Sequence, residues 1–266
     1  MVIPGYCIAQ SEEALALSKD HVGQLYCTAG IHPHFVDDYN ADSIPAIRNI
    51  VMDKHCIAIG PAGMDFINDN SLSGKEKQRE VFEAQVNLAC EIGKTPIYVY
   101  ERGAHSEVLT ILTKNKDKLA RILIHDFSGT PEQAEAYVKI GCYIGVTGDS
   151  MLVESRDWMH TSEFLAKVPL EQILLESCGR NCPTNLLPMA DVLAKTLNTS
   201  IEEVTKKIKI ASKHFIWGLT KPNSCKPATD ELSYAEICCY LYIFSCLWLF
   251  IYLFLKYVSN LEQRNT

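Results

Sequence analysis

Two segments end apolar runs with histidine, a residue type that serves as a ligand for divalent metals or as a phosphate contact. The segment AGIHPHF carries His32 and His34, and the segment ILIHDFSGT carries His125. A single imidazole does not outcompete water for a divalent ion, so a metal site needs several His, Asp or Glu ligands that converge from different parts of the chain. The partners of these histidines must therefore come from other segments.

Asp65 and Arg102 also follow apolar runs by a few positions. The guanidinium of Arg102 can bind a phosphate through two parallel hydrogen bonds, or it can form a plain ion pair with Asp65 or Glu101. The ion pair is the simpler expectation. The turn at His32 and His34 has two readings as well, a substrate contact or a structural end to its strand.

The elements that would position these residues alternate between strands and helices. Amphipathic helical spacing appears over Glu80–Ile92 and over Pro131–Ile140, where Thr130 is a suitable N-cap. Strands buried on both faces and separated by such helices indicate a parallel sheet, either open or closed as a barrel. The predicted strands are Val2–Ala9, Leu25–Gly30, Cys56–Ile59, Pro96–Tyr100, Ile122–Ile124, Cys142–Val146 and Ile173–Leu175.

A barrel is the favoured form of this sheet. An open nucleotide-binding sheet would carry a glycine-rich phosphate loop after its first strand, and the stretch VIPGYCIAQS has a single glycine. In a (β/α)₈ barrel, the functional side chains lie at the carboxyl ends of the strands. His32, Asp65, Arg102 and His125 occupy that position in the predicted elements.

Composition limits the class of protein. The chain has 266 residues, 47% hydrophobic content and a formal net charge of −7, which suit a barrel-sized core but supply no basic stripe for nucleic acid. Nucleic-acid contact would therefore need bound cations or a local pocket. The 11 cysteines are scattered and form no CxxC pair, and no charged segment followed by an apolar one opens the chain. Reduced thiols and a cytoplasmic location are expected.

Several blocks together carry a resemblance to a known family. TAGIHPH (28 to 34), AIGPAGMDF (58 to 66), YVYERGAH (98 to 105), IHDFSGT (124 to 130), YIGVTG (143 to 148), ILLES (173 to 177) and RNCPTNLL (180 to 187) follow the order of the TatD family of metal-dependent deoxyribonucleases. The chain resembles that family from its start to about Leu219. The resemblance implies a TIM-like barrel, DNA as the partner, and phosphodiester hydrolysis with divalent Mg²⁺, Mn²⁺ or Zn²⁺ at the strand ends.

The chain departs from the family pattern at most metal-ligand positions. Pro61 stands where the family has a bridging glutamate, and Tyr100 stands where it has a histidine. Proline has no side-chain donor atom, and a neutral phenol is a poor ligand. His125 matches a ligand in type, and Cys178 either replaces the last aspartate or marks the loss of its loop. The first βα unit of the family, with its Asp-x-His-x-His motif, is missing.

These departures predict a homologue that is inactive or strongly impaired, in which His125 is a remnant of the metal site. His32, His34 and Arg102 remain as candidate substrate contacts, because the first histidine of this block contacts substrate in the family. One alternative is an active nuclease with a rebuilt site made of His125, Cys178 and the nearby carboxylates of Glu101 or Asp126. Another alternative is a membrane-anchored scaffold that binds a protein partner.

The last fifth of the chain lies beyond the resemblance. Residues 1–219 form the expected barrel domain, 220–233 a linker, 234–258 a hydrophobic helix and 259–266 a polar tail. The uncharged run 237–255 is long enough to cross a membrane as a helix. It could instead dock on the seam left by the missing βα unit, or it could have no role. An open seam would leave two sheet edges unpaired and favour self-association.

Overall fold

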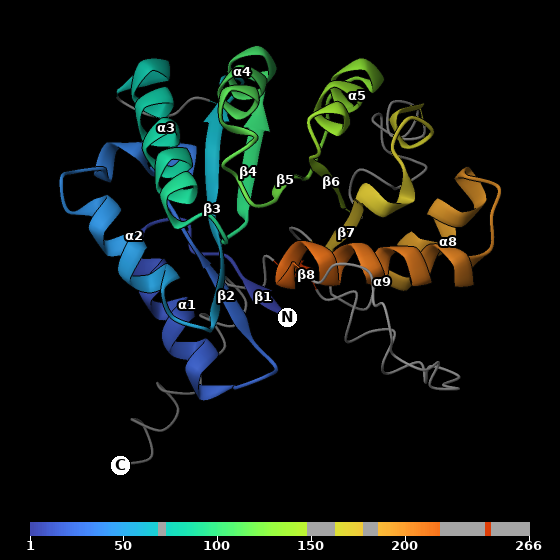
Figure 1. The fold of residues 1–266 in the computed structure, drawn as a ribbon, viewed down its shortest axis with the longest axis horizontal. Coiled ribbons are helices and arrows are strands. Elements are labelled where there is room, and N and C mark those ends of the chain that lie inside the picture. The colour runs from blue at the N-terminus through green and yellow to red at the C-terminus, as the bar shows by residue number, and fades with distance from the viewer. Residues whose placement is uncertain (69–72, 148–162, 178–185, 219–242, 246–266) are drawn as a thin grey trace, which may run out of the picture.

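A computed structural model describes residues 1–68, 73–147, 163–177, 186–218 and 243–245 of the chain (Figure 1). Eight strands form one parallel sheet in which neighbouring strands follow each other in chain order. The strands are β1 (Val2–Ile3), β2 (Tyr26–Ala29), β3 (Cys56–Asp65), β4 (Ile97–Arg102), β5 (Ile122–His125), β6 (Tyr143–Thr147), β7 (Ile173–Ser177) and β8 (Ile243–Ser245).

Helices connect the strands and lie around the outside of the curled sheet (Figure 1). This arrangement is a β/α fold of the TIM-barrel type, as predicted. The helices are α1 (Ile8–Asp20), α2 (Ser43–Val51), α3 (Gly74–Ile92), α4 (His105–Asn115), α5 (Pro131–Lys139), α8 (Leu186–Thr196) and α9 (Ile201–Trp217), with short 3₁₀ turns η1 (Pro33–Asp38) and η2 (Leu170–Gln172).

Each of the seven predicted strands is present, but the first is much shorter than predicted. The chain leaves β1 at Pro4, which has no N–H to continue the ladder, and α1 begins at Ile8. The predicted N-cap of α5 is confirmed. Thr130 Oγ1 accepts from the N–H of Gln133 at 3.3 Å, and Gln133 Oε1 accepts from the N–H of Thr130 at 3.0 Å.

Strand β3 extends six residues beyond its predicted end, and its ten residues are all buried. Gly60 and Gly63 make this possible, because a Cβ atom would lie 2.2 Å from the carbonyl oxygen of Tyr98 at the first and 1.9 Å from that of Tyr100 at the second. Both glycines have positive φ, 124° and 153°, which other residues rarely adopt. The absence of a Cβ at these two positions therefore allows β3 and β4 to pair closely up to the carboxyl end of the sheet.

The core has two parts. The larger part packs the sheet against the surrounding helices, and a smaller cluster includes Tyr98, Leu123, Leu174 and Phe215 of α9. Tyr98 and Leu123 each lie two positions before a residue of the carboxyl end, Tyr100 and His125, and so share their face of the sheet. The described cysteines are free, in agreement with the expected reduced thiols: Cys7, Cys27, Cys56, Cys90 and Cys142.

The apolar C-terminal run differs from its predicted form where the structure describes it. Ile243–Ser245 form strand β8, which pairs with β7 and contacts β1. The described part of the run is therefore a strand in the sheet and not a membrane helix, and β7 is not an edge strand as the open seam would require. No helix within the described residues is long and apolar enough to span a membrane. The linker 220–233, the polar tail 259–266 and the rest of the run lie outside the described residues.

Candidate functional site

The predicted site residues meet at the carboxyl ends of the strands. His32 follows β2, Arg102 ends β4 and His125 ends β5. His34 lies in η1, directly after His32. Because neighbouring parallel strands end on the same edge of the sheet, residues from distant parts of the chain form one cluster.

Tyr100 packs among the three histidines. Its ring centroid lies 4.4 Å from that of His32 and 6.2 Å from those of His34 and His125. The guanidinium of Arg102 lies over the Tyr100 ring at 4.7 Å from the centroid. The phenol ring therefore packs directly against the site residues, and His32 and His34 also contact each other, with ring centroids 4.7 Å apart.

His32 is buried, with 6% of its surface exposed. Its Nδ1 lies 3.2 Å from the backbone N–H of His34, which donates to it. The pKa of His32 is lowered to about 3, first by burial and then by the nearby His34 and His125, against the opposing effect of Asp65. His32 is therefore neutral near pH 7.

His34 and Asp65 form a second contact across the cluster. His34 Nε2 lies 2.9 Å from Asp65 Oδ2, while Asp65 Oδ1 accepts from the N–H groups of Ile67 at 3.0 Å and Asn68 at 2.7 Å. Burial alone would raise the pKa of Asp65, but these N–H donors and His34 outweigh it and leave the pKa below its usual value. Asp65 is thus a buried carboxylate that orients His34, which itself is partly exposed.

His125 is held by a carboxylate that the sequence analysis did not select. His125 Nδ1 lies 3.0 Å from Glu176 Oε2, which also accepts from the N–H of Asp126 at 2.9 Å. Glu176 is fully buried, and its Oε1 has no hydrogen-bond partner among the described residues. Gly145 of β6 leaves the room that this carboxylate needs, since a Cβ atom there would lie 2.1 Å from Glu176 Oε2.

The expected ion pair of Arg102 is present, but its partner differs from the predicted one. Arg102 pairs with Asp126, and Asp126 Oδ1 accepts from the hydroxyl of Thr147 at 2.6 Å. Asp65 is engaged by His34, as described above. Glu101 points elsewhere, because its Oε1 accepts from the N–H of Ala104 at 2.8 Å and its Oε2 from the hydroxyl of Tyr137 at 3.4 Å.

Two buried glutamines of α3 attach the strand ends to the helix. Gln78 Oε1 accepts from the N–H of Asp65 at 2.8 Å, and Gln78 Nε2 donates to the carbonyl of Asp65 at 3.2 Å. Gln85 makes the same pair of bonds with Ile31, at 2.8 Å and 3.0 Å. Each side-chain amide therefore satisfies both backbone groups of a residue beside the site.

The cluster does not fit the two-metal centre that the family resemblance implies. The resemblance implies metal ligands where the chain has Pro61 and Tyr100, and His34 and Glu176 are already engaged in the contacts above. No group of three or more His, Cys, Asp or Glu side chains is placed to hold a metal ion in the part of the chain that the structure describes. Cys178, the candidate thiolate ligand, lies outside that part.

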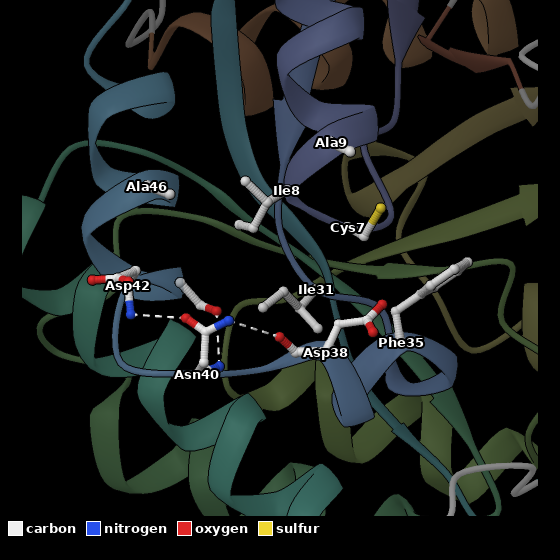
Figure 2. Close-up of a pocket in the computed structure, with 10 residues that line it drawn as sticks. Cys7, Ile8, Ala9, Ile31, Phe35, Asp38, Asn40, Asp42 and Ala46 are labelled. Carbon is white, nitrogen blue, oxygen red and sulfur yellow. Dashed lines mark hydrogen bonds between the residues drawn. The ribbon is translucent and has the colours of Figure 1, made fainter.

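A cavity of about 350 Å³ is lined by residues at the starts of α1 and α2 (Figure 2) and by residues on either side of the turn that carries the histidines. Ile31 and Phe35, which flank the turn in the chain, line it together with the start of α1 at Cys7. Its polar part holds the carboxylates of Asp38 and Asp42. These negative groups do not suit a phosphate, so the cavity is not an extension of a phosphate-binding surface.

The residues that the sequence analysis missed are those that support the site. Glu176 ends an apolar run, as His125 does, and that position could have selected it. Thr147, Gln78 and Gln85 carried no comparable signal, because a polar residue at a strand end or within a helix is ordinarily read as solvated. Their role depends on contacts between distant segments.

A family model and several curated proteins are similar to this chain over most of its length. The family model "TatD related DNase" matches residues 1–216. Proteins described as "3'-5' ssDNA/RNA exonuclease TatD" are similar over 177 residues, with 33% identity in Pantoea sp. (strain At-9b) and 32% in Shigella flexneri serotype 5b. In both, the match covers 66% of this chain and 66% of the relative, so it spans slightly less than two thirds of the relative's length.

Solved structures show the same fold. A TatD homologue from Escherichia coli k12 superposes with a TM-score of 0.72 at 23% identity, covering 81% of this chain and 85% of that one. A TatD-family hydrolase from Entamoeba histolytica superposes with a TM-score of 0.68 at 16% identity, covering 82% and 84%. At these identities, the likeness concerns the architecture.

Proposed function

Because the chain belongs to the TatD family of DNases, we propose that it is a nucleic-acid-binding TatD homologue whose phosphodiester hydrolysis is lost or strongly reduced. Nucleic acid is the proposed ligand class because the similar curated proteins are described as single-stranded DNA and RNA exonucleases. The observation that carries the proposed loss of activity is the position of Tyr100, whose ring packs among His32, His34 and His125.

A divalent ion in this family supplies charge neutralisation and an activated water for phosphodiester cleavage. Several donors must converge for such an ion to be held. Here the Tyr100 ring packs against the histidines and is a poor metal ligand, and Pro61 has no donor atom to replace a carboxylate. Losing the ion removes several kcal/mol of transition-state stabilisation, which corresponds to many powers of ten in rate.

The proposed binding mode uses the groups that remain. Arg102 offers guanidinium donors at the carboxyl end of β4, and the partly exposed His34 has its ring oriented by Asp65; both side chains lie against the Tyr100 ring. These groups can contact a phosphate or a nucleobase without cleaving the chain. His32 is neutral and buried, and its proposed role is to hold the turn and shape the surface against which a substrate would lie.

A second candidate is an active nuclease with a rebuilt, single-ion site. It is favoured by one observation, the buried Oε1 of Glu176, which has no hydrogen-bond partner among the described residues and lies on the carboxylate that holds His125. In this candidate, His125 would act with Cys178 and with Glu101 or Asp126 as ligands. Rotation of Glu101 away from Ala104 and Tyr137 would be needed first.

The two candidates are separated by measuring cleavage and binding on the same preparation. Full-length protein is incubated with end-labelled single-stranded DNA and RNA in Mg²⁺, Mn²⁺ or Zn²⁺, with and without a chelator, and binding is followed by fluorescence anisotropy. The expected result is binding without cleavage above a protein-free control. The double variant Pro61→Glu, Tyr100→His should not recover cleavage, because two added donors do not rebuild a complete two-ion ligand set.

The control is His125→Ala in the unmodified background. If the proposal holds, this variant has the same near-zero cleavage as the unmodified chain. Cleavage that needs a metal, stops with the chelator and disappears in His125→Ala would contradict the loss of activity and establish the rebuilt site. Absence of both cleavage and binding would contradict the proposal as a whole.

A further inference from the structure

We propose that strand β8, which lies in the seam between β7 and β1, is a positioning element for the site: it holds β7 at Glu176, the residue that orients His125. Residues 243–245 of the apolar run 237–255 form this strand. The segment joins the sheet more than 60 residues after β7 in the chain, and it lies beside both β7 and β1 (Figure 1).

The pairing of β8 is specific. Ile243 pairs with Glu176 and Ser245 pairs with Ser177, in parallel register and with an irregularity between the two positions. On its other side, β8 contacts β1, and β1 pairs in parallel with β2 on the side away from β8. The segment therefore stands at the place where the first and the last strands of the domain would otherwise present unpaired edges.

Those edges give the seam its affinity for a strand. The five residues of β7 are all buried, and so are the two residues of β1. Without β8, the outer N–H and C=O groups of β7 would lose their strand partner at the rim of a hydrophobic core, which is costly unless water or another strand satisfies them. An uncharged segment rich in Ile, Tyr and Phe matches this surface, because these residue types suit a strand that is buried on both faces.

The register also links the segment to the site. Ile243 pairs with Glu176, the residue whose carboxylate holds His125 and accepts from the N–H of Asp126. Strand β8 therefore supports the backbone at the position that orients His125. Displacing β8 should loosen β7 first and the His125 contact with it, while the opposite side of the sheet stays intact.

The test is amide hydrogen exchange on the full chain in the absence of lipid. A variant with Ile243→Pro and Ser245→Pro removes two backbone N–H groups of β8, and the matched control Ile243→Val and Ser245→Thr keeps them with side chains that favour strands. The proposal expects exchange in β7 to rise by about tenfold or more in the proline variant only. Exchange in α3 and β4 should stay slow in both, which shows that the domain remains folded.

Unchanged exchange in β7 of a folded proline variant would overturn the proposal. If the proline variant fails to fold, the amides of residues 243–245 in the unmodified chain decide the matter: slow exchange supports the closing strand, and exchange at the rate of an open chain overturns it. Recovery of the unmodified chain in a carbonate-resistant membrane fraction would show a membrane span instead. A concentration-dependent dimer with slow exchange at 243–245 only in the dimer would show that a second copy supplies the strand.

Discussion

His32 lies in the predicted site, but its burial lowers its pKa and keeps it neutral near pH 7. The sequence placed His32, His34, Arg102 and His125 at strand ends, and the structure brings these four together. The sequence could not show that Tyr100 would pack among them, because a tyrosine at a strand end is read equally well as a core or a surface residue. Nor could it name Asp126 as the partner of Arg102, since that choice depends on the positive φ of Asp126 and on Thr147.

The low pKa of His32 predicts a pH dependence of stability. In the unfolded chain, its pKa is about 6.5, whereas in the fold it is about 3. As the pH falls below about 6.5, the unfolded state binds a proton that the folded state does not, so the free energy of unfolding decreases, by at most about 1.4 kcal/mol per pH unit. The variant His32→Asn, which retains a polar side chain without titrating, should show a shallower decrease.

Urea denaturation between about pH 6.5 and pH 4.5 measures this effect. The window lies above the range in which Asp65 takes up its proton. The pKa of His105 is also lowered by burial, which gives the same sign, but His105 is present in both proteins and so cancels in the difference. Equal slopes for the two proteins would show that His32 is not the group responsible.

Helix α3 is the element that does most to hold the site. Its amphipathic pattern over Glu80–Ile92 predicted a helix with a buried face, and it assigned no role to Gln85. In the structure, Gln78 and Gln85 are fully buried and each binds both backbone groups of a strand-end residue. The helix therefore carries a polar function on a face that its sequence marks as apolar.

Replacing Gln85 by leucine should destabilise the fold and disturb the turn at His32. The change leaves the N–H and C=O of Ile31 buried without partners, at a cost of about 1 to 3 kcal/mol for each group, partly offset by the added apolar burial. We expect a net loss of about 2 to 3 kcal/mol in the free energy of unfolding. Asn87→Leu is the matched control, because this amide lies on the exposed side of the same helix. Similar small effects of both substitutions in urea denaturation would refute the role of Gln85.

Seven of the strands were predictable from the sequence for a physical reason, whereas β8 was not. Parallel strands buried on both faces produce continuous apolar runs, and each run that was selected became a strand. Strand β8 lies inside an apolar run whose length suits a membrane helix equally well, so local sequence could not distinguish the two. Its pairing with β7 is a contact between segments far apart in the chain, which periodicity does not reveal.

The whole molecule carries a net charge of −7, and this limits how it can hold nucleic acid. The proposed phosphate contacts are Arg102 and His34. Each phosphate neutralised on a single strand contributes about −0.7 to the slope of log affinity against log salt. We expect a slope between about −0.7 and −1.4 for single-stranded DNA, far shallower than that of a protein with a basic stripe.

Fluorescence anisotropy with a labelled oligonucleotide, between about 50 and 200 mM salt, measures this slope. Arg102→Gln should make it shallower by about 0.7, because one phosphate contact is lost. The control Lys139→Gln changes an exposed lysine on α5 whose contact is with Glu135 of its own helix, and it should leave the slope unchanged. A slope steeper than about −3 would mean that binding occurs on another surface.

The two glutamines of α3 also fix the offset between the ends of β2 and β3. They are seven positions apart, so along the helix they are separated by about 10.5 Å, and both point to one face after nearly two full turns. One is fixed to the end of β2 through Ile31 and the other to the end of β3 through Asp65. A helix that slid by one turn would break all four bonds at once, so the offset between these two strand ends is set in discrete steps and not by gradual adjustment of the packing.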